Sequence, residues 1–160
     1  MGSDNSLAEI RAFLQLDERV ATSGMPRPED FQKIAAAGYQ WVVNLALPTS
    51  DNAIANEGGI VASLGMRYAH IPVSFDSPNP EDYKIFERLM DALRDQKVFV
   101  HCAANMRVSA FMYLYQVRKG APVSEAGVSL RKIWEPDGVW AGLVASLSPT
   151  SSMETPRIPQ

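Results

Sequence analysis

The apolar positions of this chain alternate between two periods. Short, mostly apolar runs such as 41–47 are typical of strands buried in a parallel sheet. Stretches such as 81–94 instead space their apolar residues three and four apart, as one face of a helix does. The pattern predicts strands at 19–23, 41–47, 67–73 and 98–100. It predicts helices at 7–16, 27–37, 51–64, 81–94, 105–119, 123–134 and 136–147.

This alternation of strands and helices predicts one α/β domain. Crossover connections of this kind give a mainly parallel central sheet with helices on both faces. Ligands of such sheets bind beyond the carboxyl ends of the strands, here the loops after Leu47, Val73 and Val100. We expect the domain to span 1–147 and the Ser- and Pro-containing segment 148–160 to be a polar extension.

Composition narrows the class of protein further. The 160 residues are 46% apolar and 21% charged, as in an average globular protein. A net charge of −3 argues against nucleic acid as a partner, and no 18-residue apolar run predicts a membrane span. With one cysteine and two histidines, neither an intrachain disulfide nor a multi-cysteine metal site is expected. The first residues lack signal-peptide features, which favours the cytoplasm, or the periplasm had a signal been removed. The sequence does not indicate an oligomeric state.

The single cysteine, Cys102, stands in the segment VFVHCAANMRVS, after a predicted strand and directly before a predicted helix. Loop N–H groups and a helix N-terminus at this position make an anion site and favour the thiolate. Arg107 adds a fork of donors suited to a tetrahedral oxyanion. The small Ala103 and Ala104 allow close approach of a ligand, and Asn105 tolerates a left-handed turn. An isolated cysteine is usually only packed, but this combination favours a reactive thiol.

The segment resembles the signature loop of cysteine-dependent phosphatases of the dual-specificity and tyrosine type. That loop has His-Cys, five residues, Arg, and then Ser or Thr. The likeness covers about residues 17–143 and extends to a bacterial phosphatase-like domain of unknown function, sometimes fused to metallo-β-lactamase-like hydrolases. The segments similar to that domain are TSGMP at 22–26, EDF at 29–31, GY at 38–39 and VNL at 43–45.

The resemblance implies a cysteinyl-phosphate mechanism that needs no metal or organic cofactor. The partners it implies are a phosphate- or sulfate-like anion and a phosphorylated substrate. It also implies roles for five further residues. His101 would order the loop, Met106 would complete it, and Ser109 would donate to the sulfur or merely face a helix neighbour. Asp76 is the expected general acid, and Asp82 is the fallback.

The spacing of the loop departs from the phosphatase pattern. Only four residues separate Cys102 from Arg107, a spacing that resembles the rhodanese sulfurtransferase loop. Asn105 and Arg107 then fill the places of the rhodanese Gly and Arg. Three functions stay open: a phosphatase weakened by the short loop, a sulfurtransferase that carries a persulfide on Cys102, and a non-catalytic phosphate-binding module.

Overall fold

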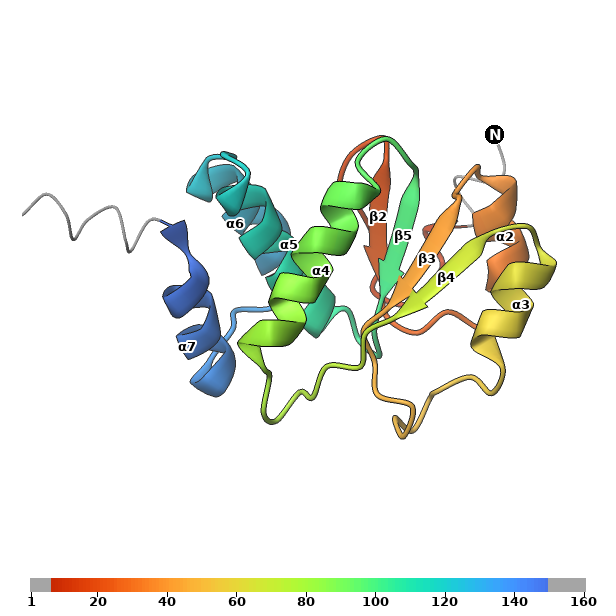
Figure 1. The fold of residues 1–160 in the computed structure, drawn as a ribbon, viewed down its shortest axis with the longest axis horizontal. Coiled ribbons are helices and arrows are strands. Elements are labelled where there is room, and N and C mark those ends of the chain that lie inside the picture. Colours follow the sequence, from red (N-terminus) through yellow and green to blue (C-terminus); the bar gives the residue numbers. More distant parts are fainter. Residues whose placement is uncertain (1–6, 150–160) are drawn as a thin grey trace, which may run out of the picture.

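The structure is a computed structural model, and it describes residues 7–149. Most of the expected polar extension, residues 150–160, therefore lies outside the described residues. A five-stranded sheet in the order β1-β2-β5-β3-β4 forms the centre of the molecule (Figure 1). Its strands are β1 (Leu14–Gln15), β2 (Val20–Ser23), β3 (Trp41–Asn44), β4 (Arg67–His70) and β5 (Val98–His101).

The sheet is parallel except at one edge. β5 lies in the middle, paired in parallel with β2 on one side and β3 on the other, and β4 extends the sheet beyond β3. Only β1 runs antiparallel, next to β2. The carboxyl ends of four strands therefore meet along one edge, where the sequence predicts ligand binding.

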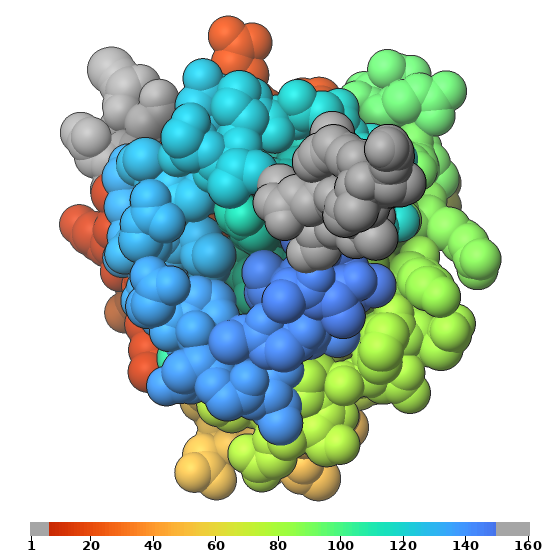
Figure 2. Space-filling view, turned by 90° about the vertical axis from the view of Figure 1, so that its left-hand side faces the viewer, coloured from red at the N-terminus to blue at the C-terminus, as the bar shows by residue number. Residues whose placement is uncertain are grey.

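Helices cover both faces of the sheet, as predicted (Figure 1). One face carries α2 (Asp30–Ala36) and α3 (Glu57–Ser63). The other carries α4 (Pro80–Ala92), α5 (Met106–Arg118), α6 (Val123–Arg131) and α7 (Gly138–Leu147). In Figure 2, which looks onto this second group, α6 and α7 lie over α5 in light and dark blue. None of these helices is long and apolar enough to cross a bilayer.

Each face of the sheet has its own apolar core, because successive strand residues point to opposite sides. In β5, Val98 and Val100 pack towards α4 and α5, whereas Phe99 packs towards α2 and α3. Continuing the alternation places the His101 ring near Phe31 of α2, with ring centroids 6.3 Å apart. Cys102 then lies in the larger core, on the side of α4 and α5.

Two predicted helices differ from the structure. No helix spans 7–16: Ala12 adopts a φ of 52°, the chain turns there, and Leu14–Gln15 pairs with β2. The helix expected at 51–64 begins only at Glu57, after Asn56 with a φ of 62°. In both places a left-handed residue interrupts the helical path. Before Glu57, Asp and Asn side chains also favour turns.

Candidate active site

The loop after β5 is held against the end of β2. Gly24 forms an isolated bridge with Ala104, and the Met25 N–H donates to the Ala103 carbonyl over 3.0 Å. A Cβ on Gly24 would come within 2.8 Å of that carbonyl oxygen, so only glycine fits at this contact. The segment at 22–26, which carried part of the family resemblance, thus supports the cysteine loop directly.

Asn105 makes the turn that the sequence predicts for it. Its φ of 69° is left-handed, and α5 begins at the next residue. Its side-chain amide donates to the Ala12 carbonyl (2.9 Å) and to Thr22 Oγ1 (3.0 Å). The short spacing between Cys102 and Arg107 is therefore accommodated by one left-handed residue with a buried anchor.

The carbonyl oxygens of the loop are bound from outside. The Ala103 oxygen accepts from the Met25 N–H, and the Met106 oxygen accepts from Trp134 Nε1 over 3.0 Å. The Cys102 oxygen faces the Nδ1 of the preceding histidine at 3.3 Å. These contacts occupy three carbonyl oxygens of the loop, and the Cys102 N–H donates to the Ser23 carbonyl over 3.3 Å.

Most N–H groups of the loop, in contrast to these carbonyls, have no partner among the described residues. Those of Ala103, Ala104 and 106–108 have no acceptor within residues 7–149. The last three belong to the first turn of α5, where intrahelical partners do not exist. A run of unpaired donors at the N-terminus of a 13-residue helix is suited to bind an anion.

Arg107 lies beside this run and is 7% exposed. Its Nη1 donates to the Val73 carbonyl over 2.9 Å, which fixes the guanidinium. Nε is buried and has no partner among the described residues. The guanidinium also lies over the Phe75 ring, 5.9 Å from the centroid. One edge of the fork is thus held by the protein, and another donor is left for a ligand.

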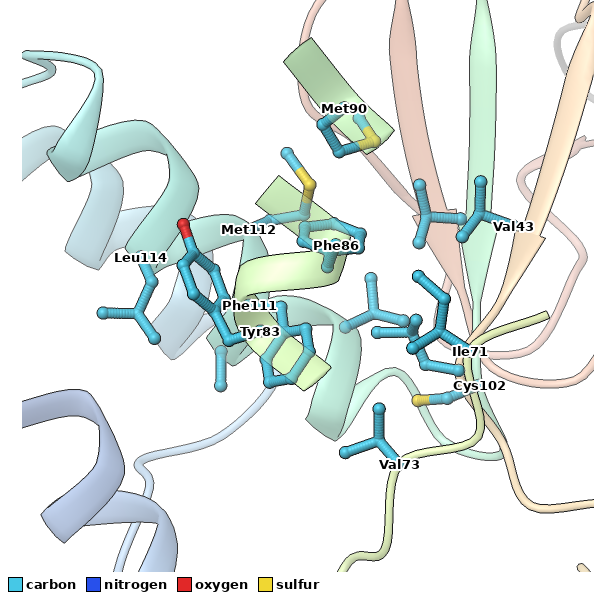
Figure 3. Close-up of a cluster of buried hydrophobic side chains, with 14 of the residues drawn as sticks. Val43, Ile71, Val73, Tyr83, Phe86, Met90, Cys102, Phe111, Met112 and Leu114 are labelled. Atoms are coloured by element: carbon cyan, nitrogen blue, oxygen red, sulfur yellow. The ribbon is translucent and has the colours of Figure 1, made fainter. Parts of the chain in front are cut away.

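Cys102 is 0% exposed and belongs to the larger apolar core. Figure 3 shows it at the end of that cluster, with Ile71 and Val73 beside it. The sulfur is therefore closed to solvent in this structure.

Behind the cysteine, His101 is fully buried and its Nε2 meets Glu57 Oε2 at 2.5 Å. Glu57 is 5% exposed, and its other oxygen accepts from Asn44 Nδ2 over 3.2 Å. The same amide donates to the Tyr68 hydroxyl. Burial, with the Glu57 carboxylate adding to it, raises the pKa of that phenol. The sequence predicted a supporting role for His101 but not this network.

The remaining predicted site residues lie in different settings. Ser109 donates to the Met106 carbonyl over 3.1 Å, so in this structure its hydroxyl is used within the helix rather than at the sulfur. Asp76 is exposed on the loop between β4 and α4, directly after Phe75. Asp82 is half-buried in the first turn of α4, and burial raises its pKa.

An aromatic cluster of Phe75, Trp134 and Trp140 connects these loops. The Phe75 ring lies 5.7 Å from Trp134 and 6.0 Å from Trp140, centroid to centroid. Trp140 Nε1 donates to the Phe75 carbonyl over 2.7 Å, and Trp134 Nε1 reaches the loop at Met106. Each tryptophan thus holds a segment of the site by its indole N–H.

Sequence reasoning missed Glu57 and the loop contact of Trp134. Glu57 is 44 residues from His101, and an acid in the first turn of a helix is ordinarily explained by the helix dipole. No local pattern distinguishes it from such a residue. Within residues 7–149, no three His, Cys, Asp or Glu side chains gather where they could hold a metal ion.

A parallel α/β sheet with a cysteine loop between its central strand and the following helix defines the class of cysteine-phosphatase-like folds. The crystal structure of Tk-PTP has this fold at a TM-score of 0.71 and 21% identity, over 85% of this chain and 95% of that one. The crystal structure of a "Putative phosphatase (DUF442)" from Shewanella putrefaciens CN-32 superposes with a TM-score of 0.81. It is 32% identical, over 92% of this chain and 97% of that one. The chain belongs to the DUF442 family, which agrees with the resemblance inferred from its sequence.

Two further comparisons concern sequence alone. No family model matches the chain. The Xylella fastidiosa "Beta-lactamase hydrolase-like protein" is 29% identical over 111 residues, which is 68% of this chain. The match takes up 26% of that protein, so the chain spans about a quarter of the curated relatives it matches. The likeness agrees with the expected relation to domains fused to such hydrolases.

Proposed function

We propose that this domain hydrolyses phosphate monoesters through the thiolate of Cys102. One observation carries the proposal: the carbonyls of Ala103 and Met106 are bound by Met25 and Trp134, while the N–H groups of Ala103, Ala104 and 106–108 and Arg107 Nε have no partner within residues 7–149. Such a site is suited to bind a dianionic phosphate, and the sulfur lies at the base of the site. The fold of the chain, shared with cysteine-based phosphatases, supports this assignment.

The proposed reaction has two steps. The Cys102 thiolate attacks phosphorus, the S–P bond forms as the ester P–O bond breaks, and the leaving oxygen takes a proton from a carboxylic acid. Water then attacks the cysteinyl phosphate and gives its proton to that carboxylate. The S–P bond breaks, and inorganic phosphate and the thiolate are released. In both steps Arg107 and the loop N–H groups stabilise the charge on the equatorial oxygens.

We propose Asp76 as the acid because it follows Phe75, whose ring lies against the Arg107 guanidinium. Asp82 is the alternative, because burial raises its pKa, and a general acid must be protonated near the working pH. Comparison of Asp76→Asn with Asp82→Asn on one alkyl phosphate decides between them.

The test measures both candidate chemistries on one preparation. We expect p-nitrophenyl phosphate to be hydrolysed by the wild type and not by Cys102→Ser, and inorganic phosphate to protect Cys102 from iodoacetamide. Sulfur transfer from thiosulfate to cyanide that depends on Cys102 would instead support the sulfurtransferase. Phosphate protection without either activity would support the binding module. A cysteine that iodoacetamide cannot reach in the folded protein would contradict both enzyme hypotheses.

The short loop has its own test. A ring of donors one residue smaller meets three equatorial oxygens less well, so we expect a slow phosphatase. Insertion of one Gly between Asn105 and Met106 restores the five-residue spacing and should raise the rate. A folded insertion variant that is slower than the wild type would show that the left-handed turn at Asn105 already provides the working geometry.

A further inference from the structure

His101 and Glu57 form a buried polar pair behind the cysteine loop. Both side chains are almost completely buried, at 0% and 5% exposure. They come from elements far apart in the sequence, the end of β5 and the start of α3. A carboxylate is costly to bury unless it is paired and hydrogen-bonded, so the pair needs an explanation.

The contacts of the pair indicate where its hydrogens lie. His101 Nδ1 faces the Cys102 carbonyl at 3.3 Å, and Nε2 faces Glu57 Oε2. A carbonyl oxygen cannot donate, so Nδ1 carries a hydrogen. Glu57 Oε1 also accepts from Asn44 Nδ2, so both carboxyl oxygens of Glu57 have a hydrogen-bonding neighbour. These contacts suit an imidazolium that donates from both ring nitrogens, to the Cys102 carbonyl and to the Glu57 carboxylate.

This arrangement has a direction relative to the sulfur. The imidazolium belongs to the residue that precedes Cys102, and the carboxylate lies on its far side, so the positive end of the pair is nearer to the loop. With both groups buried, water screens this field little. Positive charge close to a cysteine favours the thiolate, which is the nucleophile.

We propose that Glu57 is a positioning residue for the nucleophile: it keeps His101 protonated on both nitrogens, so that the imidazolium holds the Cys102 carbonyl and supports the thiolate. The inference rests on the proposed function only in taking Cys102 as the reactive group.

The neighbours of the pair come from α2, β3 and β4. Phe31 of α2 contributes an aromatic ring to His101, and the carboxylate of the adjacent Asp30 is bonded to Arg27 instead. From β4, Tyr68 shares the Asn44 amide with Glu57, and His70 lines the same cavity. The titratable groups nearest to the pair are thus the Tyr68 phenol and the His70 imidazole, whereas the Cys102 side chain lies on the other face of the sheet.

The first experiment measures alkylation of Cys102 by iodoacetamide against pH in the whole chain. In Glu57→Gln, which keeps the size and removes the charge, we expect alkylation at pH 6 to slow roughly tenfold, the effect of one buried charge interaction of ordinary size. At high pH, where every variant is thiolate, the rates should converge. The matched control Tyr68→Phe removes a hydroxyl from the same network and should keep the wild-type pH profile. A folded Glu57→Gln protein with the wild-type profile would overturn the proposal.

The second experiment needs no variant of Glu57. The chain has two histidines, so 15N-histidine labelling gives two ring systems, and His70→Gln assigns them. At pH 7 we expect both nitrogens of His101 to be protonated, and one unprotonated ring nitrogen would overturn the proposal. If the wild type lacks phosphatase activity while Glu57→Gln still shifts the alkylation profile, the proposed function fails and the role of Glu57 stands.

Discussion

The two faces of the sheet support the cysteine loop in different ways. On the face of α2 and α3, the buried His101–Glu57 pair lies behind the nucleophile, and we propose that it acts through charge. On the face of α4 to α7, the Val73 carbonyl and the rings of Phe75 and Trp134 hold Arg107 and the loop carbonyls by contact and hydrogen bonds. Adjacent residues of one strand end serve the two faces, because His101 and Cys102 point in opposite directions.

The comparison separates two requirements of the proposed chemistry. A thiolate needs a favourable potential, which a buried charge supplies even from behind the backbone. A phosphoryl group in transfer needs donors at fixed positions, which only rigid contacts around the loop supply. Variants on the α2–α3 face should therefore change the pH profile of alkylation, whereas variants on the α4–α7 face should change turnover with little effect on alkylation.

The largest effect is expected at the acid. Asp76→Asn should lower turnover of an alkyl phosphate by roughly 10²–10⁴-fold, the usual contribution of a positioned acid. The loss should be smaller for p-nitrophenyl phosphate, whose leaving group needs no proton, and alkylation of Cys102 should not change. Steady-state rates on both substrates provide the measurement. Equal losses, or none, would assign the acid to Asp82.

Arg107→Lys comes next. An ammonium group cannot both bind the Val73 carbonyl and direct a second donor at the phosphate, as the guanidinium fork can. We expect kcat/KM to fall about 10²–10³-fold, as for loss of a transition-state donor. Inorganic phosphate should also protect Cys102 less well, which a titration of alkylation against phosphate measures. Unchanged protection would show that Arg107 is only a structural link to Val73.

Trp134→Phe tests the aromatic side more finely. The ring packing against Phe75 is largely kept, but the N–H that binds the Met106 carbonyl is lost. That carbonyl still accepts from Ser109, so the cost in unfolding free energy should be about 0.5–1.5 kcal/mol. We expect kcat to fall a few-fold with an unchanged alkylation profile. Trp140→Phe, which loses its bond to the Phe75 carbonyl, is the matched control for the general cost of removing an indole N–H.

The smallest effect concerns stability on the α2–α3 face. Burial alone would raise the pKa of Asp30, but the side chain and backbone N–H of Arg27 together lower it below its ordinary value of 3.8. The ionised carboxylate therefore stabilises the fold above that value, and the contribution is lost as pH falls through the lowered pKa. In Asp30→Asn we expect a loss of about 1 kcal/mol at pH 7 and a flatter decline below pH 4. Urea unfolding at several pH values measures both. A parallel decline in the two proteins would exclude Asp30 as the group responsible.

Much of the fold could be predicted because it follows from local pattern. The apolar runs at 41–47 and 98–100 and the helical spacing at 81–94 indicated the alternation of strands and helices that the structure has. The segment around Cys102 was predicted to be a loop between a strand and a helix, because an apolar run, small residues, Asn and Arg in succession suit a sharp turn into a helix. The helix expected at 7–16 was wrong, since pairing with β2 is a contact that no local pattern records.

What the sequence by itself determined was therefore the loop: its place after a central strand, its left-handed turn at Asn105 and its donor at Arg107. Only the tertiary structure brought the partners together. Glu57 meets His101, and Trp134 meets Met106, because α3 and the segment after α6, on opposite faces of the sheet, both return to the same strand end. Such contacts join residues that are distant along the chain, and their hydrogen bonds depend on packing that a one-dimensional pattern does not contain.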